Sequence, residues 1–271
     1  MKKLCLLPAV VIGVVCAVAS AQQPAPTPYF GVNCVKVKPG KSAEFGKWTK
    51  DTLHKYAQAR VDSGALAAWI LLRAVQPSGT TNECDYVVSA FYPGTPPKPL
   101  EAEEVDALLK KSGAGVSVDQ YREKINELSE LATSGIWQQM AHAGSPGLKG
   151  SYVVINFNKT KDAQKWIATE KKIWMPFAEE LAKQGIIRGW EADLRLVPGG
   201  SDVKYDGVTV DVYPSWDAYF NFTTNPKLAE LWQKVHPDLT FETAFEDEYP
   251  KVSTQVRTEL WVIEDLVAAQ K

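Results

Sequence analysis

Two stretches of this chain resemble each other, and their resemblance decides the predicted fold. "SGALAAWILLRAVQPSG" occupies Ser63 to Gly79, and "QGIIRGWEADLRLVPGG" begins 121 positions later and occupies Gln184 to Gly200. The same spacing pairs further residues of uncommon type: Gly64 with Gly185, Trp69 with Trp190, Pro77 with Pro198, Asp85 with Asp206, Tyr92 with Tyr213, and Pro93 with Pro214. Further along the chain, well beyond these stretches, the spacing becomes 124, where Trp137 corresponds to Trp261. A period of this length is that of a domain rather than of a solenoid repeat, so the sequence predicts a duplication.

Each copy predicts the same order of elements. Residues 30–38 alternate between apolar and other side chains and are rich in valine, which indicates a strand. From 42 to 63 the apolar residues recur at helical spacing, and Gly64 stands where a left-handed C-terminal cap is expected. Strands are then predicted over 66–76 and 85–92, a helical region over 101–131, and a last strand through Trp137. In the second copy Pro176 is expected to kink or locally break the helix, because proline lacks a backbone donor.

This order, strand-helix-strand-strand-helix-strand, is typical of the ferredoxin-like fold, in which both helices cover one face of an antiparallel sheet. We therefore expect an α+β protein with two tandem ferredoxin-like βαββαβ domains at 29–142 and 150–271. The segment 143–149, "AGSPGLK", is the expected linker. Each sheet would leave its second face bare, so we expect the two domains to pack sheet to sheet as an α/β barrel within one chain.

The first 21 residues have the pattern of a cleaved export signal. Lys2 and Lys3 precede an almost wholly apolar run, and Ala19-Ser20-Ala21 supplies small residues for a signal peptidase. The sequence therefore predicts a periplasmic or secreted protein that has no membrane contact after cleavage. Removing 21 of 271 residues, two of them lysines, would leave 250 residues with 28 basic and 32 acidic side chains.

That mild acidic balance, without a basic cluster, argues against nucleic acid as a partner. Of the four cysteines, Cys34 and Cys84 would remain after cleavage. An exported chain with two cysteines suggests a disulfide. However, Cys84 at the start of the third strand should lie opposite residues near Lys38, about 13 Å along the strand from Cys34, which is too far for a disulfide. We therefore expect two free thiols.

The segment "VKVKPGKSAEFGKW" at Val35–Trp48 resembles the opening strand and helix of NIPSNAP-like and antibiotic-biosynthesis-monooxygenase-like domains. These domains belong to the dimeric α/β-barrel superfamily, and the rest of the chain resembles them only through the order of its elements. The resemblance implies a barrel whose two halves come from one chain. It also implies, as one possible activity, a cofactor-independent monooxygenase or a haem-handling enzyme.

Alternation along the strands suggests a binding site. Glu191, Asp193 and Arg195 share one face of their strand, opposite an apolar face that should meet the helices. The matching positions of the first copy include Ile70 and Leu72. From the neighbouring strands we assign Asp211 and Tyr213 to the polar wall, and Val88 and Tyr92 to the apolar wall. Such a pocket, apolar with few polar groups, suits a small molecule. The alternative is that the charged face is merely solvated.

Common catalytic and cofactor motifs are absent from the sequence. It contains no glycine-rich phosphate loop, no Cys-x-x-Cys, no His-Glu-x-x-His and no Gly-x-Ser-x-Gly. His54, His142 and His236 have no partner spacing and are interpreted as surface or loop residues. The tryptophans that recur in both copies are expected to pack sheet against helix. No metal or cofactor is predicted.

The sequence thus favours an exported binding protein, monomeric or homo-oligomeric, that holds a small apolar or aromatic molecule inside the barrel. The alternative is an enzyme of the dimeric α/β-barrel type, a cofactor-independent monooxygenase or a haem-handling protein. No catalytic residue is assigned.

Overall fold

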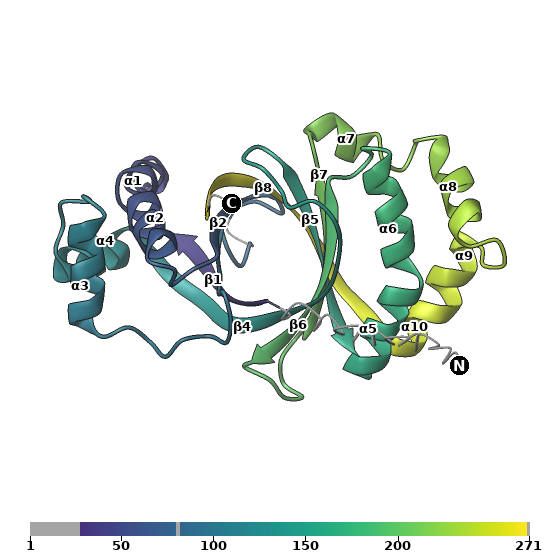
Figure 1. The fold of residues 1–271 in the computed structure, drawn as a ribbon, viewed down its shortest axis with the longest axis horizontal. Coiled ribbons are helices and arrows are strands. Elements are labelled where there is room, and N and C mark those ends of the chain that lie inside the picture. The colour runs from purple at the N-terminus through teal and green to yellow at the C-terminus, as the bar shows by residue number, and fades with distance from the viewer. Residues whose placement is uncertain (1–27, 80–81, 270–271) are drawn as a thin grey trace, which may run out of the picture.

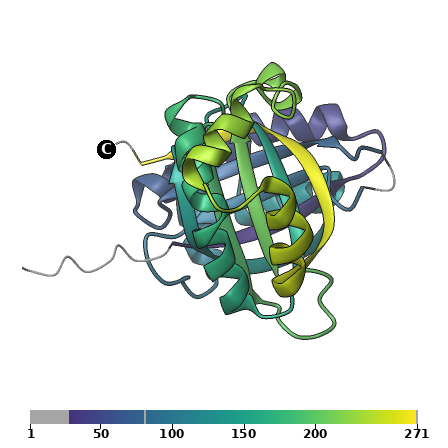
Figure 2. The same ribbon diagram turned by 90° about the vertical axis from the view of Figure 1, so that its right-hand side faces the viewer.

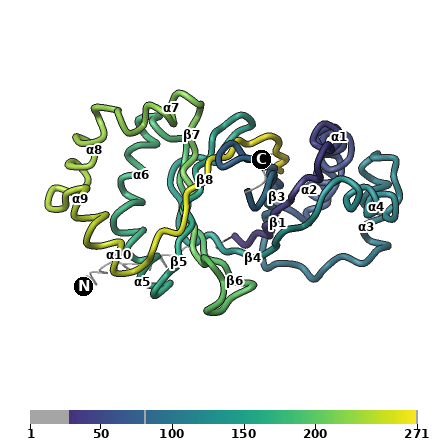
Figure 3. Tube along the Cα trace, turned by 180° about the vertical axis from the view of Figure 1, so that it is seen from behind, coloured from purple at the N-terminus to yellow at the C-terminus, as the bar shows by residue number. Residues whose placement is uncertain are grey.

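The computed structural model describes residues 28–79 and 82–269, so the predicted export signal lies outside the described residues. The fold is mixed α+β: eight antiparallel strands form a closed barrel, and helices cover two opposite sides of it (Figure 1). Figure 2 shows the helices of the second half in front of their strands, and Figure 3 shows the barrel from behind. No helix within the described ranges is both long and apolar enough to cross a membrane.

The first half of the chain supplies four strands and four α-helices. Its elements are β1 (Tyr29–Val37), α1 (Ser42–Trp48), the π-helical turn η1 (Thr49–Leu53), α2 (His54–Asp62), β2 (Ala68–Gln76), β3 (Tyr86–Phe91), α3 (Ala102–Lys111), α4 (Val118–Leu128) and β4 (Ser129–Gly144).

The second half supplies the other four strands. Its elements are β5 (Tyr152–Thr160), α5 (Ala163–Lys172), α6 (Trp174–Lys183), β6 (Gly189–Val197), β7 (Gly207–Tyr213), α7 (Trp216–Phe220), α8 (Lys227–Val235), α9 (Phe241–Thr243), the π-helical turn η2 (Ala244–Glu248), α10 (Tyr249–Val252) and β8 (Ser253–Ala268). The helix break expected at Pro176 is found three residues earlier, at Ile173 between α5 and α6.

The strands follow the order β1-β3-β2-β8-β5-β7-β6-β4 around the barrel. The two longest strands, β4 and β8, have 16 residues each and close the ring, because β4 pairs with both β1 and β6 and β8 pairs with both β5 and β2. The barrel is therefore one continuous sheet, whereas the sequence predicted two sheets packed face to face. In this ring β2 and β6 lie four strands apart in either direction, so they face each other across the interior.

The paired glycines of the repeat end equivalent helices. Gly64 follows α2 with φ 75° and Gly185 follows α6 with φ 70°, a conformation that side chains disfavour. The N–H of each glycine bonds to the carbonyl three residues back, and the next N–H bonds to the carbonyl five residues back. Both helices thus end in a Schellman motif, which explains why glycine recurs at these two positions.

The paired aspartates Asp85 and Asp206 make equivalent contacts in the two halves. The Asp85 carboxylate accepts the N–H of Val37 at 2.8 Å and pairs with Lys36 at 3.0 Å. The Asp206 carboxylate accepts the N–H of Thr160 at 2.7 Å and pairs with Lys159 at 3.3 Å. Each aspartate therefore ties the end of the first strand of its half to the segment that precedes the third.

The structure joins Cys34 and Cys84 by a disulfide bond, with their Cα atoms 5.3 Å apart. The expectation of two free thiols is wrong. The strand register was close to the expected one, since Cys34 lies opposite Val87 and a straight continuation of β3 would bring Cys84 opposite Val37. The error lay in assuming that β3 continues straight.

The β1–β3 ladder ends at the pair Val35 and Tyr86. The backbone N–H of Asp85 donates to the carbonyl of Val35, and the side-chain carboxylate of Asp85 accepts the N–H of Val37. The carboxylate therefore takes the position from which a backbone carbonyl of a longer β3 would accept the N–H of Val37. The chain before Asp85 is consequently not part of the ladder, and Cys84 reaches Cys34 inside the barrel.

Apolar side chains form three layers. The interior of the barrel holds one cluster, which includes Phe30, Leu72, Trp137, Val210 and Trp261. Between the second-half strands and their helices lies the largest cluster, centred on the fully buried Trp166 and Phe177. Two smaller clusters lie under the first-half helices, around Leu71 and Phe45. Trp69 and Trp190 pack under helices as expected, whereas Trp137 and Trp261 point into the barrel.

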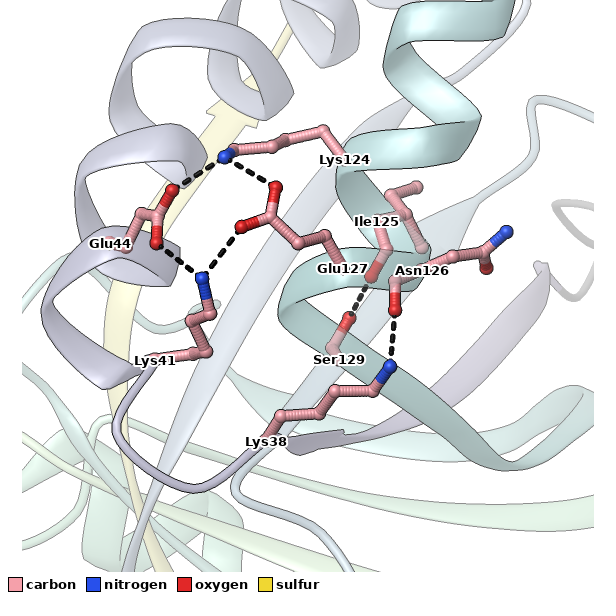
Figure 4. Close-up of polar contacts among 8 residues, drawn as sticks. All are labelled: Lys38, Lys41, Glu44, Lys124, Ile125, Asn126, Glu127 and Ser129. Atoms are coloured by element: carbon pink, nitrogen blue, oxygen red, sulfur yellow. Dashed lines mark hydrogen bonds and ion pairs between the residues drawn. The ribbon is translucent and has the colours of Figure 1, made fainter.

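On the surface of the first half, four charged side chains form a ring that links α1 to α4 (Figure 4). Lys41 contacts Glu44 at 3.0 Å and Glu127 at 2.6 Å, while Lys124 contacts the same two carboxylates at 2.5 and 2.8 Å. Side-chain bonds from both lysines hold the pKa of Glu127 down to about 2. All four side chains are about a third or more exposed, so the surrounding water and salt weaken the ring.

Lys124→Gln should lower the melting temperature slightly at low salt, because it removes two of the four ion pairs. The difference from wild type should vanish in about 1 M NaCl, where the screening length is about 3 Å. Differential scanning calorimetry at both salt concentrations tests this, with the exposed Lys98→Gln as a control that removes the same charge. A deficit that persists at high salt, or an equal deficit in the control, would contradict an electrostatic role for the ring.

Candidate functional site

The interior of the barrel contains a cavity of about 410 Å³. Alternate residues of every strand point into the barrel. Most of these inward-facing residues are apolar, so the wall of the cavity is mostly apolar. The apolar lining comes from β1, β2 and β3 on one side and from β5, β7 and β8 on another: Phe30, Val32, Ile70, Leu72, Val87, Phe91, Val153, Ile155, Val208, Val210, Val212 and Ile263. A volume of this size suits a small organic molecule.

One strip of the cavity wall is acidic. Glu191 and Asp193, two residues apart on β6, both line the cavity. Gln139 on the neighbouring β4 donates a hydrogen bond to Glu191. Asp193 is only 1% exposed, and its Oδ1 has no hydrogen-bond partner among the described residues. An unpartnered buried carboxyl oxygen is rare in folded proteins because its desolvation is costly.

Burial raises the pKa of both carboxyl groups. For Asp193 the pKa is well above its ordinary value, first because of desolvation and then because Glu191 is a neighbouring negative charge. For Glu191 desolvation raises the pKa, and the hydrogen bond from Gln139 partly offsets this. The pair thus keeps protons that an exposed pair would release, so it can accept or donate a proton at a higher pH than ordinary carboxylates can.

Two arginines stand at one end of the cavity against aromatic rings. The Arg195 guanidinium lies 5.7 Å from the ring centre of Trp137 and 5.6 Å from that of Tyr205. Arg257 lies 4.4 Å from the ring of Phe157 and pairs with two carboxylates, Glu83 at 2.9 Å and Glu259 at 2.8 Å. The positive charge of Arg257 is therefore compensated. Arg195 has no ion pair in the part of the chain that the structure describes.

Five of the nine sequence-predicted site residues line this cavity: Ile70, Leu72, Glu191, Asp193 and Arg195. Ile70 and Leu72 on β2 face Glu191 and Asp193 on β6 across the ring. The cavity thus has an apolar wall and a polar wall at the positions where the two copies of the repeat differ.

The other four predicted residues do not line the barrel cavity. In the β6–β7 ladder, Glu191 lies opposite Val210 and Asp193 opposite Val208, so Asp211 and Tyr213 belong to the outer face. Val88 and Tyr92 likewise pack in the cluster under the first-half helices. The sequence of β7 alternates valine with Thr209, Asp211 and Tyr213, and the polar set was assigned to the barrel by analogy with β6. In the structure both faces of β7 are buried and the polar set lies on the helix side.

Sequence reasoning missed several residues of the cavity wall. Gln139, Tyr205, Arg257, Glu259 and Trp261 all contribute to it. The last three alternate along β8 at positions 257, 259 and 261, and this period of two could have identified an inward face. Tyr205 precedes β7 in a loop, where no periodic pattern applies.

Asp211 and Tyr213 instead line a second cavity, of about 500 Å³, outside the barrel wall between β5, β7 and the helices of the second half. Its acidic groups have protein partners. Asp211 accepts from Trp174 and from Asn156, both at 3.3 Å, and Glu170 accepts from the Tyr249 hydroxyl at 3.1 Å.

Desolvation dominates the titration of both groups. It raises the pKa of Glu170 to about 8 and that of Asp211 to about 7, although the hydrogen bonds oppose the shift. Both side chains are at most 6% exposed.

The structure places the three histidines on separate parts of the fold. His54 pairs with Asp265 at 2.7 Å, which corrects the expectation that it lacks a partner, and the Nε2 of His236 contacts the carbonyl of Ile173 at 2.7 Å. His142 lines the barrel cavity, and no histidine lines the second cavity. Among the described residues no cluster of histidine, cysteine and acidic side chains could hold a metal ion.

Comparison with protein-family models and with curated protein sequences gives no match. Solved structures, however, share the architecture. A candidate monooxygenase from Lactobacillus acidophilus NCFM superposes with a TM-score of 0.53 at 12% identity, covering 89% of this chain and 96% of that one. A candidate monooxygenase from Fusobacterium nucleatum subsp. nucleatum gives 0.53 at 11% identity, covering 90% and 95%.

An anthrone oxidase-like protein gives a TM-score of 0.50 at 12% identity, covering 92% of this chain and 95% of that one. These neighbours belong to the dimeric α/β-barrel superfamily. At such identities the likeness concerns the fold alone: this chain shares the α+β barrel architecture of these neighbours.

Proposed function

We propose that this protein binds a small apolar or aromatic molecule inside its barrel. The observation that supports this most strongly is the cavity of about 410 Å³, apolar on most of its wall and carrying the unpartnered Asp193 carboxyl on one strip. A wall of this kind gains free energy when an apolar surface displaces water, by about 25 cal/mol for each Å² buried. The few polar groups would orient the ligand.

Filling part of the cavity should weaken binding. Leu72→Trp places a larger side chain in the apolar wall. The affinity of this variant for the neutral aromatic probe 1-naphthalenemethanol should fall by about tenfold or more, which corresponds to losing the burial of roughly two methylene groups. Isothermal titration calorimetry measures this. Leu131→Trp is the matched control, since Leu131 is 63% exposed and lies outside the cavity. Equal affinities of both variants and wild type would refute the site.

We also propose that the protein is exported and that its two halves arose by duplication. The disulfide supports export, because disulfides persist mainly in oxidising compartments. The equivalent glycine caps and aspartate contacts of the two halves support duplication into two ferredoxin-like units. N-terminal sequencing of the protein from its own cells tests export and should find the chain beginning near Gln22.

A second candidate function is oxidation of an aromatic substrate without a cofactor. The supporting observation is Asp193, a buried carboxyl whose raised pKa suits it to accept a proton from a substrate held against the apolar wall. Solved structures of this fold include one described as a candidate monooxygenase and one described as anthrone oxidase-like.

Anthrone tests this candidate: it would consume one O₂ and yield anthraquinone and water. Oxygen uptake that Asp193→Asn abolishes would favour the enzyme over the binding protein. Uptake no faster than that of buffer would exclude anthrone as a substrate.

A further inference from the structure

Inside the barrel two acidic groups face the cavity without a cation. Glu191 has a neutral partner, Gln139, and Asp193 Oδ1 has none. No described lysine or arginine forms an ion pair with either group. Two carboxyl groups on one inward face therefore lack the positive charge that usually accompanies buried acids.

The two arginines of the cavity are engaged elsewhere. Arg257 is paired with Glu83 and Glu259. Arg195 lies against the rings of Trp137 and Tyr205, and its NH2 donates to the Ser134 carbonyl at 3.4 Å. Neither guanidinium neutralises the Glu191–Asp193 pair.

From this arrangement we infer that the ligand carries a protonated amine on its apolar body, and that the Glu191–Asp193 pair binds this amine. An ammonium group has three N–H donors, which match the free oxygens of the two carboxyl groups. Its charge would allow both groups to ionise together in an apolar surround. This inference rests on the proposed function and adds the chemical class of the ligand.

The alternatives fit the wall less well. A carboxylate ligand would meet two acidic groups, and among the described lining residues Arg195 is the one cationic side chain without an ion pair. Arg195 is itself packed against the rings of Trp137 and Tyr205. A neutral alcohol would bring one donor to the pair and leave its charge uncompensated. In the second cavity, by contrast, Asp211 and Glu170 already accept hydrogen bonds from protein groups, so nothing there requires a cation.

Three probes with the same ring system separate these possibilities: 1-naphthalenemethylamine, 1-naphthalenemethanol and 1-naphthoic acid, titrated by calorimetry at pH 7. The amine should bind wild type about tenfold or more tightly than the alcohol, as expected for a charge-assisted hydrogen bond in place of a neutral one. Asp193→Asn should lower the affinity for the amine more than that for the alcohol, and so remove the preference. Glu191→Gln should reduce the preference.

The matched control is Asp211→Asn, which removes a buried carboxyl from the neighbouring strand but on the outer face of the barrel. It should keep the preference for the amine. Equal binding of the amine and the alcohol, or tightest binding of naphthoic acid, would overturn the inference and leave the proposed function standing. If none of the three probes binds, the proposed function fails and the inference fails with it.

Discussion

Removal of the Cys34–Cys84 disulfide is expected to lower the free energy of unfolding by about 4 kcal/mol, the entropy cost of a closed loop of this length. The two cysteines are 50 residues apart in sequence, and the bond closes a loop that includes α1, α2 and β2. Both side chains are under 10% exposed, so the double variant Cys34→Ala/Cys84→Ala is a surer test than a reductant added to the folded protein. Guanidinium unfolding, followed by tryptophan fluorescence, measures the difference.

The control is wild type unfolded in the presence of a reductant, which should approach the stability of the double variant. Peptide mapping of unreduced protein should find Cys34 and Cys84 in one linked pair of peptides. Unlinked peptides, or a double variant as stable as oxidised wild type, would contradict the bond or its contribution.

Stability is expected to fall as the pH rises from about 5 to 8, with Glu170 as a main cause. Its folded pKa is about 8, above the ordinary 4.5, so the folded protein keeps a proton that the unfolded chain has released in this window. The stability that it contributes is complete below pH 4.5 and is lost as the pH rises toward 8. One such proton changes the free energy of unfolding by about 1.4 kcal/mol per pH unit. Asp211, with a pKa of about 7, acts in the same direction.

Glu170→Gln should flatten this slope and be more stable than wild type at pH 8, because it removes a buried group that must ionise there. Chemical unfolding at pH 5, 6.5 and 8 measures it, with the exposed Glu179→Gln on α6 as control. Surface carboxylates with lowered pKa values, such as Glu127, lose their contribution only below about pH 4.5, outside the window. A slope that is unchanged in Glu170→Gln would show that Glu170 is not responsible for it.

The repeat predicted the order of the strands and helices because equivalent positions do equivalent work. Gly64 and Gly185 end helices, and Asp85 and Asp206 hold the first strand of each half. These roles require one residue type, so they leave a signal in the sequence. The closure of the barrel left none, because it depends on the second halves of β4 and β8, which pair with β6 and β2 of the other half of the chain. No residue type in the sequence marks a strand that continues into a second pairing of this kind.

The inward face was predicted correctly on β6 and wrongly on β7, although the sequence alternates between apolar and polar residues on both strands. On β6 the apolar and charged residues alternate, and Glu191, Asp193 and Arg195 line the cavity as expected. On β7 both faces are buried, so the period of two cannot distinguish the barrel face from the helix face. The disulfide was missed for a third reason. The side chain of Asp85 ends the β1–β3 ladder, so the neighbouring Cys84 lies outside the regular strand register.

A crystal structure of the protein soaked with 1-bromonaphthalene tests the proposed binding site most directly. The anomalous signal of bromine locates the ligand even where the electron density does not define the orientation of the ring. We predict a bromine peak inside the barrel, between Ile70 on β2 and Val210 on β7. A peak confined to the cavity between the second-half strands and their helices, or the absence of any peak in the barrel, would contradict the account.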